Sequence, residues 1–417
     1  MPHPENDEMK KIILRFVPSF LVSLFLSASL IGCATAPSPI LSSSGQSSLA
    51  ELLESIRVEE RLPALSAAVI IDGKIHAAAA VGTRKFGLEN WVTVNDSFLI
   101  ASCTKAFTAT LAAVLIENGI LSWNTTLREA FPDLEMRSDY ENITLIQLLS
   151  HRAGLPEWVD HLTSSTINDQ FLNKWWVDYK PPMVMRSRYL EETVKQKLVD
   201  EPDNSVYYSN SGYIMAGAML EKVAGKSYEK LMVEKIFNPL GLHTAGFGPP
   251  MRINSEHQPF GHSAAGWSPT PIDRDFPVYM APTAAIHISI KDWAKFILFQ
   301  LQPVINGKMV LKDDAVKKLH TPPNNANWRK DAEKNGYGIA SLNYALGWYT
   351  LDIGGKEGLL WHPGGNTGFI AQVIMDRNHK NAFMVVTNVR KKHKHLFQAM
   401  SRIKEFYSDL ADLPEIK

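Results

Sequence analysis

The chain has 417 residues, and its 43 basic and 43 acidic side chains give a formal net charge of zero at pH 7. No basic excess points to a nucleic-acid partner, and no acidic excess points to a solvating tail. Hydrophobic residues make up 45% of the sequence, which is enough to bury a large core. The length suits two substructures, or one large domain with an insertion.

The first residues predict an export signal. Met9, Lys10 and Lys11 form a positive start, the stretch 12–31 is mostly apolar, and Cys33 follows Leu-Ile-Gly. This order is typical of a bacterial lipoprotein signal peptide that ends at the cysteine to be lipidated. A retained membrane-spanning anchor is the alternative, because the apolar stretch is about long enough to cross a bilayer.

The lipoprotein interpretation divides the chain into three parts. We expect residues 1–33 to be the signal peptide, residues 34–48 to be a flexible tether, and residues 49–417 to be the folded domain. Lipidated Cys33 would hold the protein in the cell envelope, facing the periplasm, and we expect the outer membrane. Cys103 is the other cysteine, so no disulfide can form within the mature chain.

Short-range patterns predict the first elements of the domain. Apolar residues at helical spacing over 49–61 predict an amphipathic helix. The apolar runs 64–71 and 74–81 predict two strands joined by an Asp-Gly turn, which is a strong hairpin signal. The stretch 106–116 is apolar on nearly all sides, so it predicts a helix in the middle of the protein.

Ser102 and Lys105 stand three residues apart at the start of this buried helix, so their side chains share one face. A buried lysine that lacks full solvation loses its proton more easily. A serine hydroxyl is a weak nucleophile until a base removes its proton, and a neighbouring lysine can be that base. The pair indicates nucleophilic catalysis, although S-x-x-K alone is a common pattern.

The middle of the chain holds two further candidate segments. His151 closes a predicted helix that begins near Leu145, and we interpret it as a hydrogen-bonded structural histidine rather than a catalyst. Tyr208 and Asn210 stand at the entrance of a helix predicted over 211–223. There a phenol can act as acid or base, and a carboxamide can orient a substrate or a lysine. A plain helix cap is the alternative.

The C-terminal part is strand-rich. Strands are predicted over residues 344–351, 359–361, 369–375 and 382–389, and an amphipathic helix over residues 396–410. Between the second and third strands, residues 362–368 read His-Pro-Gly-Gly-Asn-Thr-Gly and predict a loop. Paired glycines let a backbone approach a ligand closely, and their N–H groups can bind an oxyanion. Residues 163–198 are less regular and predict a helical or looped insert.

Three ordered motifs resemble those of the penicillin-recognising serine hydrolases, which include class C β-lactamases, D-alanyl-D-alanine peptidases, D-aminopeptidases and β-lactamase-fold esterases. The motifs are Ser102-x-x-Lys105, Tyr208-x-Asn210 and His362-x-Gly364. Similar text lies around and between them, over residues 148–156, 208–213, 221–229 and 237–242. Three motifs in order with such text are a specific signal, and the resemblance covers residues 49–410.

The resemblance implies an α+β fold of the β-lactamase type. A five-stranded antiparallel sheet, flanked by helices, would be built from residues 49–95 and 290–417. A mostly helical region over residues 96–289 would be inserted, with the active site in the groove between the two parts. No metal and no organic cofactor are implied, and the sequence has no clustered Cys and His ligand set.

By similarity, Ser102 attacks a carbonyl and forms an acyl-enzyme, while Lys105 and Tyr208 move its proton; which of the two is the base stays open. Asn210 would hold the substrate or Lys105, and the N–H groups of Ser102 and Gly365 would form the oxyanion hole. The predicted substrate-binding residues are Asn210, His362, Gly364, Gly365 and Asn366.

The third motif departs from the pattern of many β-lactamases. His362 stands in place of lysine, and Pro363 stands in place of a polar residue. A histidine with a pKa of about 6.5 is mostly neutral at pH 7, so it anchors a substrate carboxylate less firmly, and proline lacks an N–H. Asn366 would compensate only in part. We therefore expect carboxylate-bearing β-lactams to be poorer substrates than esters or amides without that group.

The sequence thus predicts a serine hydrolase of the cell envelope that acts on small-molecule esters, D-amino-acid amides or peptidoglycan-type peptides. A β-lactamase or D,D-carboxypeptidase proper is one alternative. The other is a non-catalytic lipoprotein that binds peptidoglycan or a partner. The presence of Ser102, Lys105, Tyr208 and Asn210 favours an enzyme, because binding scaffolds tend to lose such groups.

Overall fold

A computed structural model describes residues 44–157, 181–254, 257–264, 268–273, 277–305, 308–309, 311–323, 339–353, 356–390 and 394–411. All of them belong to one compact unit, Ser42–Lys417. The predicted signal peptide, Cys33 and residues 34–43 of the tether lie outside the described residues, as do residues 158–180. Within the part that is described, no helix has both the length and the apolar character needed to cross a membrane.

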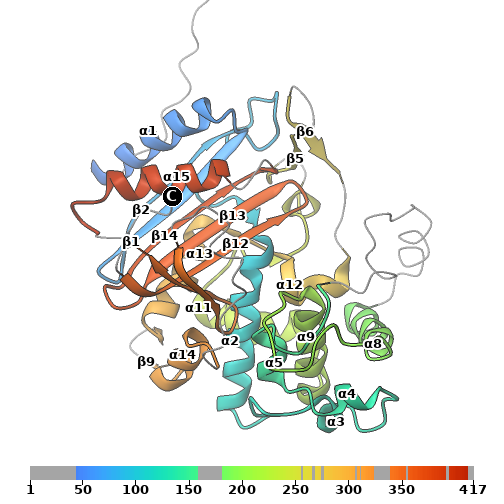
Figure 1. Ribbon diagram of the computed structural model, residues 1–417. Helices are drawn as coiled ribbons and strands as arrows, with labels where there is room; N and C mark the ends of the chain where they lie inside the picture. The colour runs from blue at the N-terminus through green and yellow to red at the C-terminus, as the bar shows by residue number, and fades with distance from the viewer. Residues whose placement is uncertain are drawn as a thin grey trace, which may run out of the picture. The chain divides into compact units, whose positions relative to one another are not determined.

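A seven-stranded antiparallel sheet is the centre of the fold (Figure 1). Its strands, in spatial order, are β10 (Ile339–Tyr344), β11 (Tyr349–Ile353), β12 (Lys356–Asn366), β13 (Phe369–Asp376), β14 (Asn381–Thr387), β1 (Ala64–Ile71) and β2 (Lys74–Gly82). An early and a late part of the sequence meet where β1 pairs with β14, with Leu65 opposite Thr387. The fold class is confirmed, but the sheet has seven strands rather than the five expected.

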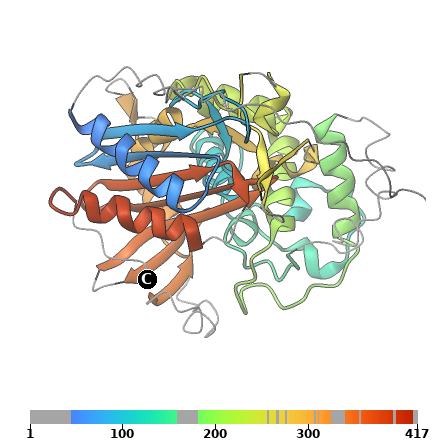
Figure 2. The same ribbon diagram turned by 90° about the horizontal axis from the view of Figure 1, so that it is seen from above.

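Two helices cover the outer face of this sheet. They are α1 (Ser44–Glu59) and α15 (Lys394–Phe406), which lie side by side in both views (Figures 1 and 2). Leu65, Ala67 and Val69 of β1 pack toward them, because alternate residues of a strand point to the same face. Helix α1 begins at Ser44, so its first turn lies inside the predicted tether.

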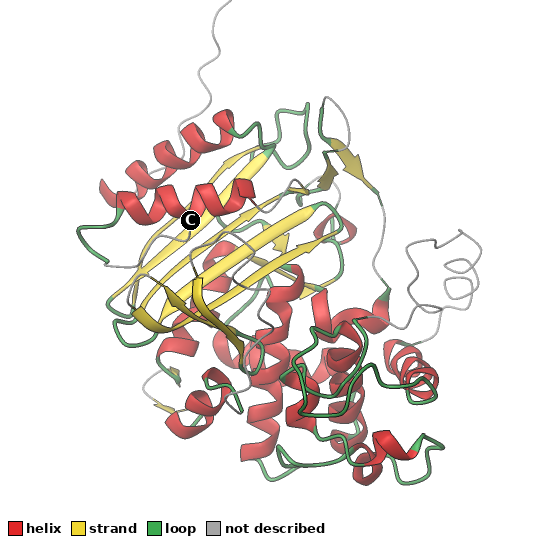
Figure 3. Cartoon of the chain, viewed as in Figure 1, coloured by secondary structure: helices red, strands yellow, loops and turns green. Residues whose placement is uncertain are grey.

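The inner face of the sheet packs on a second layer of helices (Figure 3). The alternate β1 residues Ala64, Ala68 and Ile70 belong to this larger core. Helix α13 (Ile290–Leu301) lies against β1, β2 and β14. Because β1 is buried on both faces, it reads as a continuous apolar run rather than as an alternating one.

The helical part surrounds α2 (Thr104–Glu117), which is buried along nearly its whole length, as its sequence predicts. The other α-helices described in this part are α3 (Leu127–Ala130), α4 (Ser138–Glu141), α5 (Leu145–Leu149), α8 (Pro182–Thr193), α9 (Asn210–Ala224), α10 (Tyr228–Met232), α11 (Asn238–Leu240) and α12 (Ala281–Ala284). Helix α14 (Asp313–His320) also contacts α2. Helix α2 therefore lies between the sheet and the helical part (Figure 1).

Small sheets complete the structure. One contains β3 (Ser97–Leu99), β7 (Ile286–Ser289) and β4 (Gly246–Phe247), and another contains β15 (Val389–Arg390), β5 (Gly261–Ser263) and β6 (Thr270–Ile272). A hairpin pairs β8 (Val304–Ile305) with β9 (Lys308–Met309). Strand β3 leads directly into the start of α2, so its position sets the position of Ser102.

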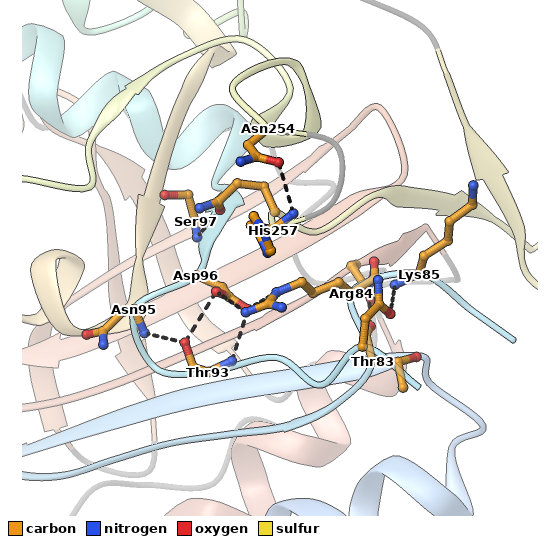
Figure 4. Close-up of polar contacts among 12 residues, drawn as sticks. Thr83, Arg84, Lys85, Thr93, Asn95, Asp96, Ser97, Asn254 and His257 are labelled. Carbon is orange, nitrogen blue, oxygen red and sulfur yellow. Dashed lines mark hydrogen bonds and ion pairs between the residues drawn. The ribbon is translucent and has the colours of Figure 1, made fainter. Parts of the chain in front are cut away.

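The connection from β2 to β3 is fixed by a polar cluster (Figure 4). The Arg84 guanidinium makes two hydrogen bonds to the Asp96 carboxylate, at 2.8 and 3.0 Å. The same carboxylate accepts hydrogen bonds from the backbone N–H and the hydroxyl of Thr93. Asp96 is buried and immediately precedes β3, so the cluster anchors the strand that carries the chain toward the site.

Two C-terminal elements differ from the sequence expectation. The single strand predicted over 344–351 is broken after Tyr344, and β11 starts at Tyr349. Gly347 in this turn has a φ of +82°, and a Cβ there would lie 2.7 Å from the Lys105 carbonyl oxygen. The turn therefore needs glycine to pack on α2. Residues 362–366, expected in a loop, continue β12 instead.

Candidate active site

Ser102 lies in a short 3₁₀ turn, Ala101–Cys103, that joins β3 to α2. Ala101 is buried and has a φ of +47°, a left-handed conformation that costs free energy for any residue with a Cβ. This sharp turn leaves the Ser102 side chain half-buried. Strain immediately before a reactive side chain is a recurrent feature of functional sites, because it directs that side chain out of the regular helix.

Lys105 is buried one turn further along, and three groups surround its amine. Nζ lies 3.3 Å from Ser102 Oγ, 2.7 Å from Asn210 Oδ1 and 3.1 Å from the Thr283 carbonyl oxygen. The amide and carbonyl oxygens can only accept, so they take two N–H groups of the amine. The remaining position of the nitrogen faces the Ser102 hydroxyl.

Burial lowers the pKa of Lys105 well below its ordinary value of 10.5, because a charge is costly where water is excluded. The negative charge of Glu157 opposes this shift. Burial thus favours the neutral amine, whose lone pair would lie where the Ser102 hydroxyl can donate to it. The geometry and the pKa direction together provide a base beside the serine.

Tyr208 lies just before α9 and close to both Ser102 and Lys105. The Lys105 amine is 4.8 Å from the centre of the Tyr208 ring. Burial raises the pKa of Tyr208 well above 10, and the neighbouring Tyr349 raises it further, while a hydrogen bond with Ser102 lowers it. The phenol therefore keeps its proton at neutral pH and is a proton donor rather than a base.

Asn210, the first residue of α9, connects the site. Its Oδ1 accepts hydrogen bonds from the Lys105 amine and from the Thr283 hydroxyl, each at 2.7 Å. These two donors fix the amide orientation and direct Nδ2 toward Glu157 Oε1, 3.5 Å away. The sequence analysis did not identify Thr283 as part of the site.

His362 is buried within β12, with 1% of its surface exposed. Its Nδ1 donates to the Pro363 carbonyl oxygen at 2.7 Å, so its Nε2 accepts from the Tyr344 hydroxyl at 3.0 Å. Burial, together with the nearby Lys105, lowers the pKa of His362 to about 3. The geometry gives His362 a structural role in place of the substrate contact that the motif predicts.

Gly364 brings β12 against the turn that carries Ser102. A Cβ at this position would lie 2.2 Å from the Ile100 carbonyl oxygen and 3.0 Å from the Ser102 nitrogen. No side chain fits such an approach. Gly365 follows in the strand and pairs with Ile370 of β13, so β12 places Gly364 against the nucleophile turn, and the oxyanion role of Gly365 stays a prediction.

Asn366 ends β12 before the turn formed by Thr367 and Gly368, whose φ angles are +43° and +80°. Its Oδ1 accepts a hydrogen bond from the Thr367 hydroxyl at 3.1 Å. Its Nδ2 is buried and has no hydrogen-bond partner among the described residues. The substrate contact predicted for Asn366 stays a prediction.

His151 packs behind Tyr208, with 4.4 Å between the two ring centres. Its Nδ1 accepts a hydrogen bond from the Ser209 N–H at 3.0 Å. Burial lowers the pKa of His151 well below 6.5, and Lys105 and His362 lower it further. The imidazole is neutral and holds the backbone next to Tyr208, which agrees with its interpretation as a hydrogen-bonded structural histidine.

Tyr344 and Tyr349 add an aromatic wall that the sequence analysis did not identify. The Tyr349 ring lies parallel to that of Tyr208, 6.4 Å away, and perpendicular to that of Tyr344, 4.8 Å away. Both residues flank the turn that was predicted as continuous strand.

Among the described residues, no group of three His, Cys, Asp or Glu side chains is placed to hold a metal ion.

A serine, a lysine, a tyrosine and an asparagine thus meet at the junction of a sheet and a helical region, an arrangement typical of the β-lactamase-like fold. Residues 49–405 match the family described as Beta-lactamase. The chain belongs to this family.

The named relatives are distant. The chain is 23% identical to the protein Flp of Staphylococcus aureus strain COL over 85% of its own length and 65% of that protein, so it spans slightly less than two thirds of this relative. It is 25% identical to penicillin-binding protein 4 of Amycolatopsis lactamdurans, over 60% and 62% of the two chains.

A solved structure confirms the fold. The octameric penicillin-binding protein homologue from Pyrococcus abyssi superposes with a TM-score of 0.67 at 21% identity, covering 87% of this chain and 77% of that one. At this identity the likeness concerns the fold alone.

Proposed function

We propose that the protein is a serine hydrolase that works through an acyl-enzyme on Ser102, with esters and D-amino-acid amides or peptides of the cell envelope as substrates. The observation that carries the proposal is the buried Lys105 amine, 3.3 Å from Ser102 Oγ with its other contacts occupied by acceptors. Such an amine has no clear structural purpose, since a buried lysine costs stability.

In the first step, the Lys105 amine takes the Ser102 proton while Oγ bonds to the substrate carbonyl carbon. The carbonyl oxygen becomes an oxyanion near the N–H groups of Ser102 and Gly365, which would stabilise it. The tetrahedral intermediate then expels the alcohol or amine, which receives a proton. Water repeats the sequence on the acyl-enzyme, so that acid is released and Ser102 regains its proton.

Tyr208 is the proposed donor to the leaving group, because its raised pKa keeps it protonated and it hydrogen-bonds Ser102. The proton that Lys105 accepts returns to Tyr208 in the same cycle. Asn210 holds the amine in place, which supports the lysine-orienting alternative for this residue. The division assigns the base to Lys105 and the acid to Tyr208.

Substrates without a carboxylate fit this site better than β-lactams do. His362 is neutral and its ring nitrogens are occupied, so it offers no cation to a carboxylate. The relative named penicillin-binding protein 4 supports a site whose serine is acylated by an amide-type substrate. We also propose that Cys33 is lipidated and tethers the domain to the envelope, because it follows Leu-Ile-Gly at the end of the predicted signal peptide.

The test is mass spectrometry of the full-length protein after exposure to p-nitrophenyl butyrate and to benzylpenicillin. We expect Ser102-dependent release of nitrophenol and a transient butyryl adduct on Ser102, both absent in Ser102→Ala. Little or no penicilloyl adduct is expected. If neither reagent acylates a folded protein, a non-catalytic envelope protein is the better interpretation. Rapid benzylpenicillin turnover would instead indicate a β-lactamase.

A further inference from the structure

Glu157 is built into the entrance of α9. Its backbone carbonyl oxygen accepts hydrogen bonds from the N–H groups of Asn210 at 3.0 Å and Ser211 at 3.3 Å. The first N–H groups of a helix have no partner within the helix, so this carbonyl group satisfies two of them. The contact fixes the Glu157 backbone beside the residue that holds Lys105.

The Glu157 side chain is exposed, yet it reaches the site through Asn210. Oε1 lies 3.5 Å from Asn210 Nδ2, while Oδ1 of the same amide takes the donors of Lys105 and Thr283. One amide therefore separates the buried amine from the exposed carboxylate. A separation of 3.5 Å is at the long limit of a hydrogen bond, so a ligand group can take this contact with little loss.

Charge at the site favours the same interpretation. Glu157 acts electrostatically on both Lys105 and Tyr349, which places its negative charge within reach of the base and of the aromatic wall. Lys105 has a lowered pKa, and His362 is neutral and enclosed. The carboxylate is thus the charge that an incoming substrate meets next to Asn210.

We propose that Glu157 is a specificity-determining residue that binds a cationic group of the substrate, an ammonium or a guanidinium, and repels a substrate carboxylate. The substrates would be esters or amides with a positive charge near the scissile carbonyl. The inference rests on the proposed hydrolase function of Ser102 and deepens it. His362 offers no cation to a substrate carboxylate, and Glu157 would in addition repel one. Specificity commonly combines attraction of the preferred substrate with repulsion of its competitor.

The test uses three p-nitrophenyl esters with acyl chains of similar length. They are p-nitrophenyl butyrate, p-nitrophenyl 4-(trimethylammonio)butyrate and mono-p-nitrophenyl glutarate, which are neutral, cationic and anionic. The full-length protein is assayed for kcat/KM on each, with Ser102→Ala as the blank for spontaneous hydrolysis. We expect kcat/KM to fall in the order cationic, neutral, anionic.

Glu157→Gln keeps the backbone contacts and removes the charge. Relative to the neutral ester, whose kcat/KM also reports any effect on Lys105, it should lower kcat/KM for the cationic ester about fivefold and raise it severalfold for the anionic ester, as expected for one partly solvated ion pair. Glu405→Gln on α15 makes the same change in net charge on the outer face and should change none of the three. An equal effect of Glu157→Gln on all three esters, or none, overturns the inference.

A binding measurement separates this inference from the hydrolase proposal. Calorimetry with 4-(trimethylammonio)butyramide and with neutral butyramide reads the charge preference without turnover. Loss of the cation preference in Glu157→Gln supports the inference, and equal binding of both amides by the unchanged protein refutes it. Absence of Ser102-dependent hydrolysis of all three esters refutes the hydrolase alone.

Discussion

The Tyr344 hydroxyl donates a hydrogen bond to Nε2 of His362 across 3.0 Å, and strand β11 separates their two strands in the sheet. This contact and the Pro363 carbonyl oxygen occupy both ring nitrogens of His362, so the imidazole is held in its neutral form. The motif position that holds a cation in many relatives of this type is here part of the sheet core. Two consequences follow, one for substrate charge and one for pH.

The first prediction concerns acid sensitivity. Burial lowers the pKa of His362 to about 3, of His320 to about 3 and of His287 to about 4, from an ordinary 6.5. These groups are neutral in the fold and protonate in the unfolded chain below pH 6.5, so the folded state loses stability as pH falls from 6.5 toward 4. At pH 5 each of these histidines lowers the free energy of unfolding by about 2 kcal/mol relative to neutral pH.

Thermal unfolding followed by circular dichroism between pH 7.5 and 5 tests this. We expect Tm to fall steeply below pH 6.5, and His320→Gln, which removes one such group away from the site, should make the fall shallower. A Tm that stays constant from pH 7.5 to 5 would contradict the buried neutral histidines.

Thr283→Val should lower kcat/KM for p-nitrophenyl butyrate about tenfold, because Asn210 Oδ1 loses one of its two donors and the Lys105 amine is held less firmly. The acidic limb of the pH–rate profile, which reports Lys105, should shift as well. Thr110→Val on α2 is the matched control: it removes a buried hydroxyl that contacts Ala106 and Gln300. It should cost stability and spare activity.

Gly364→Ala should reduce acylation by more than about a hundredfold, since the added Cβ would collide with the Ile100 carbonyl oxygen and push β12 away from the Ser102 turn. The matched control lies on the same strand: Gly358 has open space around a Cβ, with a φ of +71°. Gly358→Ala should cost about 1 kcal/mol of stability and keep its activity. Rates of butyryl adduct formation compare the two, and equal rates would refute the close-approach role of Gly364.

Local patterns predict the parts of this structure that depend on near neighbours. The apolar run before Glu117 gives α2, and the Asp72-Gly73 turn gives the hairpin of β1 and β2, with φ angles of +50° and +69° at the turn. Ser102 and Lys105 share a helix face by spacing alone. Periodicity does not predict that Tyr208 and Asn210 lie near Ser102. That long-range contact is predicted only by the resemblance of the three motifs to a known family.

Contacts between distant segments could not be predicted in this way. Thr283 reaches Asn210 from α12, and Glu157 reaches it from a loop, so neither has a spacing signal. The sequence predicted one strand across Tyr344 and Tyr349 because residues on both sides of Gly347 favour β structure. The turn at Gly347 depends on its packing against α2, which local sequence does not reveal. The strand through residues 362–366 contains a proline and two glycines, which from sequence favour a loop. These residues form a strand because Gly364 packs closely against the Ser102 turn.

The last prediction concerns the support of α9. Arg186 of α8 is fully buried and binds Glu221 of α9 through two hydrogen bonds, at 2.5 and 3.0 Å, and Glu229 at 2.8 Å. Arg186→Leu leaves the buried Glu221 carboxylate without a cation, so we expect a loss of about 3–5 kcal/mol of unfolding free energy. Lys195→Ala removes an exposed ion pair with Glu192 and should cost less than about 1 kcal/mol.

Urea unfolding of Arg186→Leu, Lys195→Ala and the double variant Arg186→Leu/Glu221→Leu separates the cost of an unpaired charge from the loss of packing. The double variant should recover part of the lost stability, because it removes the stranded carboxylate. Since Asn210 begins the helix that Glu221 anchors, Arg186→Leu should also inactivate at a lower temperature than the unchanged protein, with normal acylation of Ser102 below that temperature. A double variant less stable than Arg186→Leu would show that Glu221 stabilises α9 through its other contact, with the Tyr228 N–H, more than through the arginine.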